Sequence, residues 1–201
     1  MGILLYDGLP EEYCGYELST DFRNMINVDL ILSDREMNDR DRVVLALAQL
    51  YPVIPDDYMK AVEGLQWFYG GGRRAKKQVG EQGPGAIAKK GYDFEEDADY
   101  IYSAFCETYQ IRLVEIEYMH WWEFIALFKG LPDETMIKKI IYWRTCDLNR
   151  IKSKEQKQLV REMRARFPLD EGVDLQGVTQ EEMMEKTMRY YDNRIKNKPL
   201  S

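Results

Sequence analysis

The spacing of apolar residues constrains the fold of this chain more than any other feature. In segment after segment they recur three and four positions apart, which is the period of a helix with one buried face. Sustained alternation, which is typical of a half-buried strand, is not seen. Of the 201 residues, 45% are hydrophobic, which is enough for a core. We therefore predict an all-α protein, folded as a compact multi-helix bundle.

Start and stop signals divide residues 1–150 into helices. Ser19 or Thr20 would cap the first helix, Pro52 would end the second, and the pattern Asp93-x-x-Glu96 would open the fourth. The predicted ranges are 20–32, 42–51, 55–69, 93–109, 116–129 and 133–149.

The domain of residues 1–150 is interrupted at 70–92 by a stretch of different composition. Residues 70–91 contain seven glycines, one proline and a single acid, which predicts a mobile Gly-rich loop. The loop could contact nucleic acid or an acidic partner, but it has no aromatic residue between 70 and 90 for stacking on bases, so a solvated linker is favoured. Its basic residues are Arg73, Arg74, Lys76, Lys77, Lys89 and Lys90.

Residues 151–201 are predicted to form a C-terminal arm of two helices. Capping boxes at Ser153-x-x-Gln156 and Thr179-x-x-Glu182 would open helices at about 154–167 and 180–197. The last helix has a narrow apolar stripe that must dock somewhere, either on its own domain or in a groove of another protein. The residues of that stripe are Met184, Met188, Tyr191 and Ile195.

Two adjacent tryptophans, Trp121 and Trp122, are further candidates for partner binding. Aromatic residues dominate interface hot spots, but in a long apolar helix they more often belong to the core. Core packing is the favoured interpretation.

The sequence offers few groups for catalysis. His120, the sole histidine, lies three residues from both Glu117 and Glu123, so on a helix the carboxylates would favour the imidazolium. An acid–base role is one interpretation, and a wetted stripe on a buried helix is the favoured one. The three cysteines are scattered and no phosphate-loop motif is present. We expect no enzymatic activity, no cofactor and no metal.

Net charge and hydropathy limit the partners and the location. A net charge of −7 disfavours general affinity for nucleic acid. No segment reaches the roughly 20 apolar residues of a membrane span, and the N-terminus does not resemble a secretion signal. These features predict a cytosolic protein, and they leave homo-oligomerisation open.

One long segment resembles a known family. Residues 97–132, DADYIYSAFCETYQIRLVEIEYMHWWEFIALFKGLP, resemble the tailed-bacteriophage proteins named gene product fifteen, with HWWEF as the most specific part. The resemblance includes DFR at 21–23, Tyr-Pro at 51–52, WFYGGG at 67–72 and IIYWR at 140–144, and covers about residues 15–165. Where members usually read Tyr-Gly-Ile-Asp-Leu, residues 109–113 read Tyr-Gln-Ile-Arg-Leu.

The resemblance implies a role in phage tail assembly. Genes of this family lie in tail clusters, between the tail-tube and tape-measure genes, where tail-assembly chaperones are normally encoded. The implied function is to bind the tape-measure protein, the tail-tube protein or both in the cytoplasm of the bacterial host, including hosts that carry the phage as a prophage. The alternative is a structural tail or connector component retained in the virion. The resemblance transfers no catalytic residue.

Overall fold

The computed structural model describes residues 8–34, 36–72 and 91–169, and these residues form a predominantly helical fold. The predicted all-α class is confirmed. The basic residues from Arg73 to Lys90 and the stripe from Met184 to Ile195 lie outside the described residues. The helices are α1 (Phe22–Ser33), α2 (Asp39–Leu50), α3 (Tyr58–Tyr69), α4 (Ala98–Tyr109), α5 (Trp121–Gly130), α6 (Met136–Thr145) and α7 (Lys154–Arg166), with a 3-10 turn at Leu148–Arg150.

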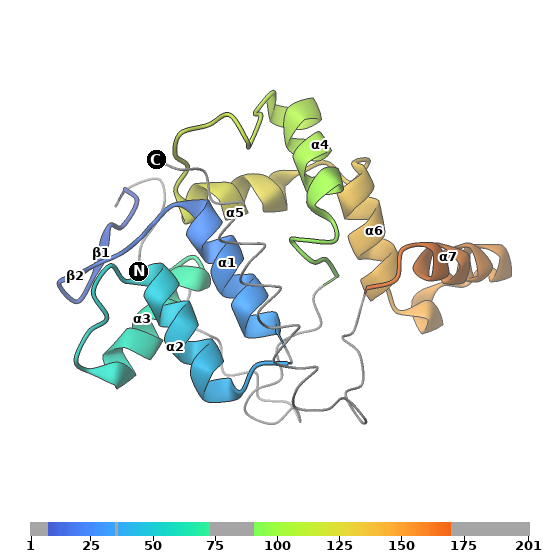
Figure 1. Cartoon of the computed structure of the whole chain (residues 1–201). Coiled ribbons are helices and arrows are strands. Elements are labelled where there is room, and N and C mark those ends of the chain that lie inside the picture. The colour runs from blue at the N-terminus through green and yellow to red at the C-terminus, as the bar shows by residue number, and fades with distance from the viewer. Residues whose placement is uncertain (1–7, 35, 73–90, 170–201) are drawn as a thin grey trace.

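Helix α1 lies at the centre of the arrangement and packs against both α2 and α5. Helix α3 packs against α2, while α4 and α7 both pack against α6. In Figure 1, α7 lies at the right-hand edge, on the far side of α6 from α1, α2 and α3. The molecule therefore has a body of packed helices and one helix that projects from it.

Stacked aromatic rings fill the body. The ring of Phe124 on α5 stacks on Phe22 of α1, with centroids 4.8 Å apart, and on Phe105 of α4, with centroids 5.2 Å apart. Trp121 and Phe128 stack on the same ring from within α5. Because these residues come from three helices, the aromatic core joins α1, α4 and α5.

The N-terminal caps of three helices differ from the expectation or extend it. Asp21 caps α1, accepting the N–H of Arg23 at 2.9 Å, so the prediction of Ser19 or Thr20 was wrong. The physical reason is that residues 20 and 22 are held extended by backbone pairing with the segment before α5. Helix α2 starts three residues earlier than predicted because Asn38 caps it, and Asp57 caps α3.

The predicted helix at 116–129 is shorter than expected, because α5 begins only at Trp121. The N–H of Phe22 donates to the carbonyl of Met119 at 2.9 Å, and the Arg23 guanidinium donates to the carbonyl of Ile116 at 2.6 Å. These contacts from α1 use carbonyls that a helix would have needed. Tertiary pairing therefore replaces the first turn of the predicted helix.

The remaining starts divide in the same way. Asp93 accepts the N–H of Glu96 at 3.1 Å as its capping pattern predicts, but it closes a turn, and α4 begins later at Ala98. Helix α6 ends at Thr145, before the predicted end. The capping box at Ser153 is confirmed, since its hydroxyl accepts the N–H of Gln156 at 3.3 Å and opens α7. The division into a domain of residues 1–150 and an arm of 151–201 stays a prediction.

A two-stranded hairpin precedes α1 and was not predicted. Strands β1 (Glu12–Tyr13) and β2 (Tyr16–Glu17) are antiparallel and joined at Cys14-Gly15, both of which have positive φ, at 52° and 81°. Such a conformation suits a two-residue hairpin turn. Strands of two residues are too short for an alternating pattern to show, so the periodicity could not reveal them.

Gly64 on α3 lets the hairpin and the end of α2 approach. A Cβ at this position would lie 2.7 Å from the Tyr13 ring and would overlap the hydroxyl of Tyr51, which donates to the carbonyl of Ala61 at 3.2 Å. Both tyrosines therefore occupy space that only glycine leaves open.

We predict that Gly64→Ala lowers the free energy of unfolding by about 1–3 kcal/mol through overpacking. Alanine favours a helix interior by up to about 1 kcal/mol over glycine, so a net loss must come from the clash. Urea unfolding followed by circular dichroism measures it. Gln66→Ala, at an exposed position of the same helix, is the control, and equal stability of the two variants would contradict the close approach.

Candidate interaction surfaces

Trp121 and Trp122 are buried, with 3% and 2% of their surfaces exposed. Their indole N–H groups donate to the carbonyls of Tyr69 at 3.1 Å and Phe68 at 2.8 Å, at the end of α3. A Cβ at Gly72 would lie 2.5 Å from the Trp122 ring, so the glycine run that follows α3 lets this indole close over it. Both indoles are core residues that join α5 to α3, and neither presents a surface to a partner.

His120 caps α5 and does not share a helical stripe with Glu117 and Glu123. Its Nδ1 accepts the N–H of Trp122 at 3.0 Å, and its Nε2 lies 3.0 Å from the carbonyl oxygen of Pro10. This pair of contacts requires the neutral ring with its proton on Nε2. The side chain is 1% exposed, so the interpretation as a wetted stripe was wrong.

Burial lowers the pKa of His120, although the Pro10 carbonyl and the charges of Glu123 and Glu11 act in the opposite direction. The expectation that the carboxylates favour the imidazolium was therefore wrong. Both ring nitrogens are used by backbone groups, which leaves neither free to exchange a proton with a substrate. His120 links residue 10, the hairpin's N-terminal neighbour, to the start of α5.

We predict that His120 makes the protein less stable as the pH falls from 7 to 5. Its folded-state pKa lies below the ordinary value of about 6.5, so the unfolded chain binds the proton first and gains in free energy over this window. Urea unfolding across this pH range measures the loss. His120→Asn keeps a cap acceptor without a titrating group, so its unfolding free energy should vary less with pH, and identical slopes would contradict the assignment.

Arg144 on α6 forms a buried ion pair with Asp97 at the start of α4. Their side chains are 8% and 3% exposed, and the two nitrogens of the guanidinium contact the two carboxylate oxygens at 2.6 Å and 3.1 Å. The same guanidinium donates to the carbonyls of Gly91 at 3.1 Å, Phe167 at 2.9 Å and Pro168 at 3.1 Å. All five of its N–H groups thus have acceptors. Asp97 opens the long family-like segment and Arg144 ends IIYWR, so the two motifs meet in space.

Sequence reasoning missed this ion pair. A single arginine inside an otherwise apolar stretch, IIYWR, was the one signal that it could have used. The acceptor could not be chosen from the sequence, because five acids lie between Asp93 and Asp99.

We predict that Asp97→Asn and Arg144→Met each lower the unfolding free energy by about 3–5 kcal/mol, because each leaves a buried charge without its partner. The double variant should lose less than the sum of the two single losses. Guanidinium chloride unfolding of the four proteins measures this coupling. Additive losses would show that the two charges do not depend on each other.

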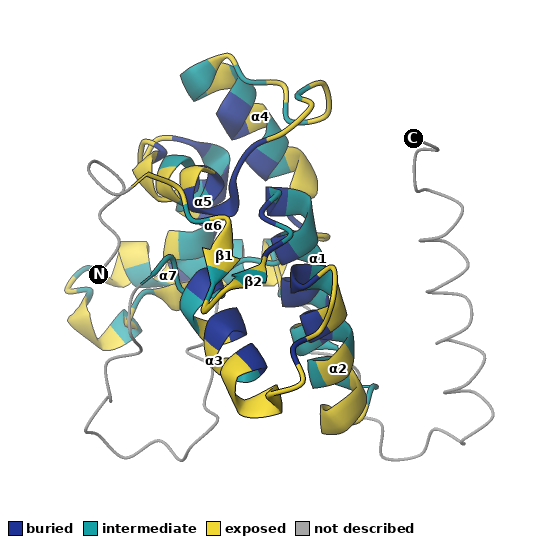
Figure 2. Cartoon of the chain, turned by 90° about the vertical axis from the view of Figure 1, so that its left-hand side faces the viewer, coloured by how far each residue is buried: buried dark blue, intermediate teal, exposed yellow. Residues whose placement is uncertain are grey.

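Two exposed apolar surfaces remain on the body. The corner patch, at the α2–α3 turn and the first turn of α3, comprises Val53, Ile54, Tyr58 and Met59, with Val53 80% and Met59 67% exposed (Figure 2). The loop patch, between α4 and α5, comprises Val114, 75% exposed, and Tyr118. Apolar residues that gather on a surface mark sites of protein contact.

The described residues hold no group of three or more His, Cys, Asp or Glu side chains placed to bind a metal ion. In the same ranges, no helix is long and apolar enough to cross a membrane.

Comparison with known proteins places this helical chain among bacteriophage proteins. It belongs to the family described as Bacteriophage Gp15 protein, which matches residues 5–169 and confirms the resemblance seen in the sequence. No curated protein and no solved structure matches the chain.

Proposed function

We propose that this protein is a tail-assembly chaperone-like protein, which binds the tape-measure protein, the tail-tube protein or both of its own phage. The observation that carries the proposal is the family match over residues 5–169. It acts in the cytoplasm of the bacterial host, by binding and without catalysis. The engagement of both His120 nitrogens by backbone groups supports a role without acid–base chemistry.

The physical task fits the surfaces described. A tape-measure protein is a long, partly apolar helical chain whose exposed stripes must be covered until tube subunits surround it. The corner patch and the loop patch offer apolar area outside the core, with Val53, Met59 and Val114 all more than half exposed. Burial of such area against the partner would supply the binding free energy.

A second candidate is a structural tail or connector component that stays in the virion. Helix α7 favours it, because it projects from the body and exposes most of its surface, as a lasting contact between subunits would need. Mass spectrometry of purified virions separates the two roles, since a chaperone should be absent from the finished particle.

Co-expression with the tape-measure and tail-tube proteins of the same phage tests the proposal. We expect either partner to become soluble and to co-elute with this chain on size exclusion. Met59→Glu or Val114→Glu should then reduce the captured partner by at least about tenfold, equivalent to about 1.4 kcal/mol, and so identify the patch used. Gln66→Glu adds the same charge at an exposed position of α3 and should have no effect.

If neither partner gains solubility or co-elutes, the chaperone proposal fails. If capture succeeds but neither substitution weakens it, binding occurs elsewhere on the chain and the roles of the two patches are refuted.

A further inference from the structure

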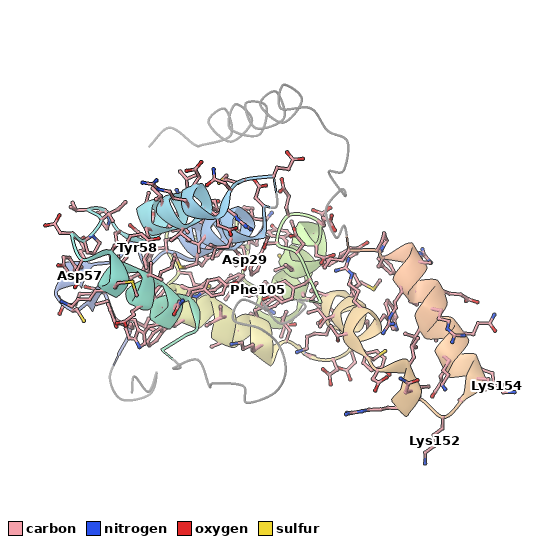
Figure 3. The ribbon with its side chains drawn as sticks, turned by 90° about the horizontal axis from the view of Figure 1, so that it is seen from below. Asp29, Asp57, Tyr58, Phe105, Lys152 and Lys154 are labelled. Carbon is pink, nitrogen blue, oxygen red and sulfur yellow. The ribbon has the colours of Figure 1, made fainter. Side chains whose placement is uncertain are left out.

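Charge is distributed very unevenly between the body and the projecting helix. The described residues before Met136 contain 23 Asp and Glu but only six Lys and Arg, whereas residues 136–169 contain ten Lys and Arg and three Asp and Glu. Figure 3 shows Lys152 and Lys154 at one end of the molecule and Asp57 and Tyr58 at the other. The protein therefore has an acidic body with a basic extension.

The basic tip, defined as Lys152, Lys154 and Lys157, lies at the N-terminus of α7. Positive charge at a helix N-terminus opposes the helix dipole and costs about 0.3–1 kcal/mol. Among the described residues, no carboxylate forms an ion pair with any of these lysines. Helix stability therefore does not explain their position.

The acidic end, defined as Glu12, Glu17 and Asp56, lies beside the corner patch. Glu12 and Glu17 face each other directly across the hairpin, where like charges cost roughly 0.2–1 kcal/mol. Lys60 of the same region is already bound to Asp57 at 3.0 Å. The hairpin sits on α3 through the approach of Tyr13 to Gly64, so the acids and the exposed apolar residues share one end of the body.

We propose that copies of this protein associate head to tail, with the basic tip of one copy on the acidic end and corner patch of the next. Each cluster is unfavourable in an isolated chain, and the two have opposite signs. They lie at opposite ends, so a copy cannot satisfy its own clusters but every copy carries the complement.

Apolar contact makes the association stronger than surface charges alone. Exposed ion pairs contribute about 0–1 kcal/mol each, so they orient the copies while burial supplies the affinity. Val53 and Met59 on the corner patch and Leu159 on the exposed side of α7 are placed to provide it. The contact joins two different surfaces, which is a heterologous interface and produces rings or open chains.

A nucleic acid is the competing occupant of the basic tip. The acidic body would repel a polyanion, whereas it attracts the basic tip of another copy. The second copy is therefore the partner that the charge distribution favours. This inference concerns the protein alone, and it does not depend on the proposed tail role.

A charge-swap experiment on the full chain tests the interface. Sedimentation velocity of the wild type should show a mass that rises with concentration at about 0.1 M salt and falls back toward monomer at about 1 M, as the Debye length drops from about 10 Å to about 3 Å. Reversal of the basic tip to glutamate, or of the acidic end to lysine, should each weaken association at least about tenfold.

Mixing the two reversed variants should restore association, because each then carries what the other needs. Reversal of three exposed acids elsewhere on the body gives the matched control for net charge and should leave association intact; these are Glu107→Lys, Glu117→Lys and Glu134→Lys.

Three results would overturn the proposal. One is a monomer at every concentration, and another is association that survives both reversals or is not restored by mixing. The third is salt-sensitive binding of a labelled DNA duplex that is lost when the basic tip is reversed, in a protein that stays monomeric.

Discussion

The buried ion pair between Arg144 and Asp97 is the interaction on which the relation between the body and α7 depends. It joins the start of α4 to the end of α6, and through the carbonyls of Phe167 and Pro168 it holds the end of α7. Taking two charges out of water costs free energy, which the complete set of guanidinium hydrogen bonds offsets. The arrangement fixes a position more than it adds stability, because the paired geometry allows one placement of three chain segments.

A second constraint organises the other side of the molecule. Backbone pairing between residues 20–22 and 119–121 brings α1 and α5 together before their side chains meet. The stacked rings of Phe22 and Phe124 follow directly from this pairing. His120 sits at the junction, and its buried neutral ring joins α5 to Pro10. The aromatic core is thus built on a backbone contact between segments about a hundred residues apart.

Local signals in the sequence predicted what local interactions determine. The helical class, the cap at Ser153 and the core role of Trp121 could be inferred because spacing and capping act within a few residues. The late start of α5, the role of His120 and the pairing of Arg144 could not, since each depends on a distant carbonyl or carboxylate. The corner patch escaped notice for the same reason: Val53 and Met59 look like core residues until the packing of α2 on α3 shows which side faces outward.

The contacts of Arg144 have a mechanical consequence. The described chain resumes at Gly91 and ends at Leu169, and the guanidinium binds the carbonyl of Gly91 and that of Pro168, next to the second of these points. A force applied along the chain at either point is therefore resisted by the same buried group and passes through Asp97 into α4. The pairing of α1 with α5 lies outside this path. Tension at these junctions would strain α4 and α6 and leave the aromatic core of the body unloaded.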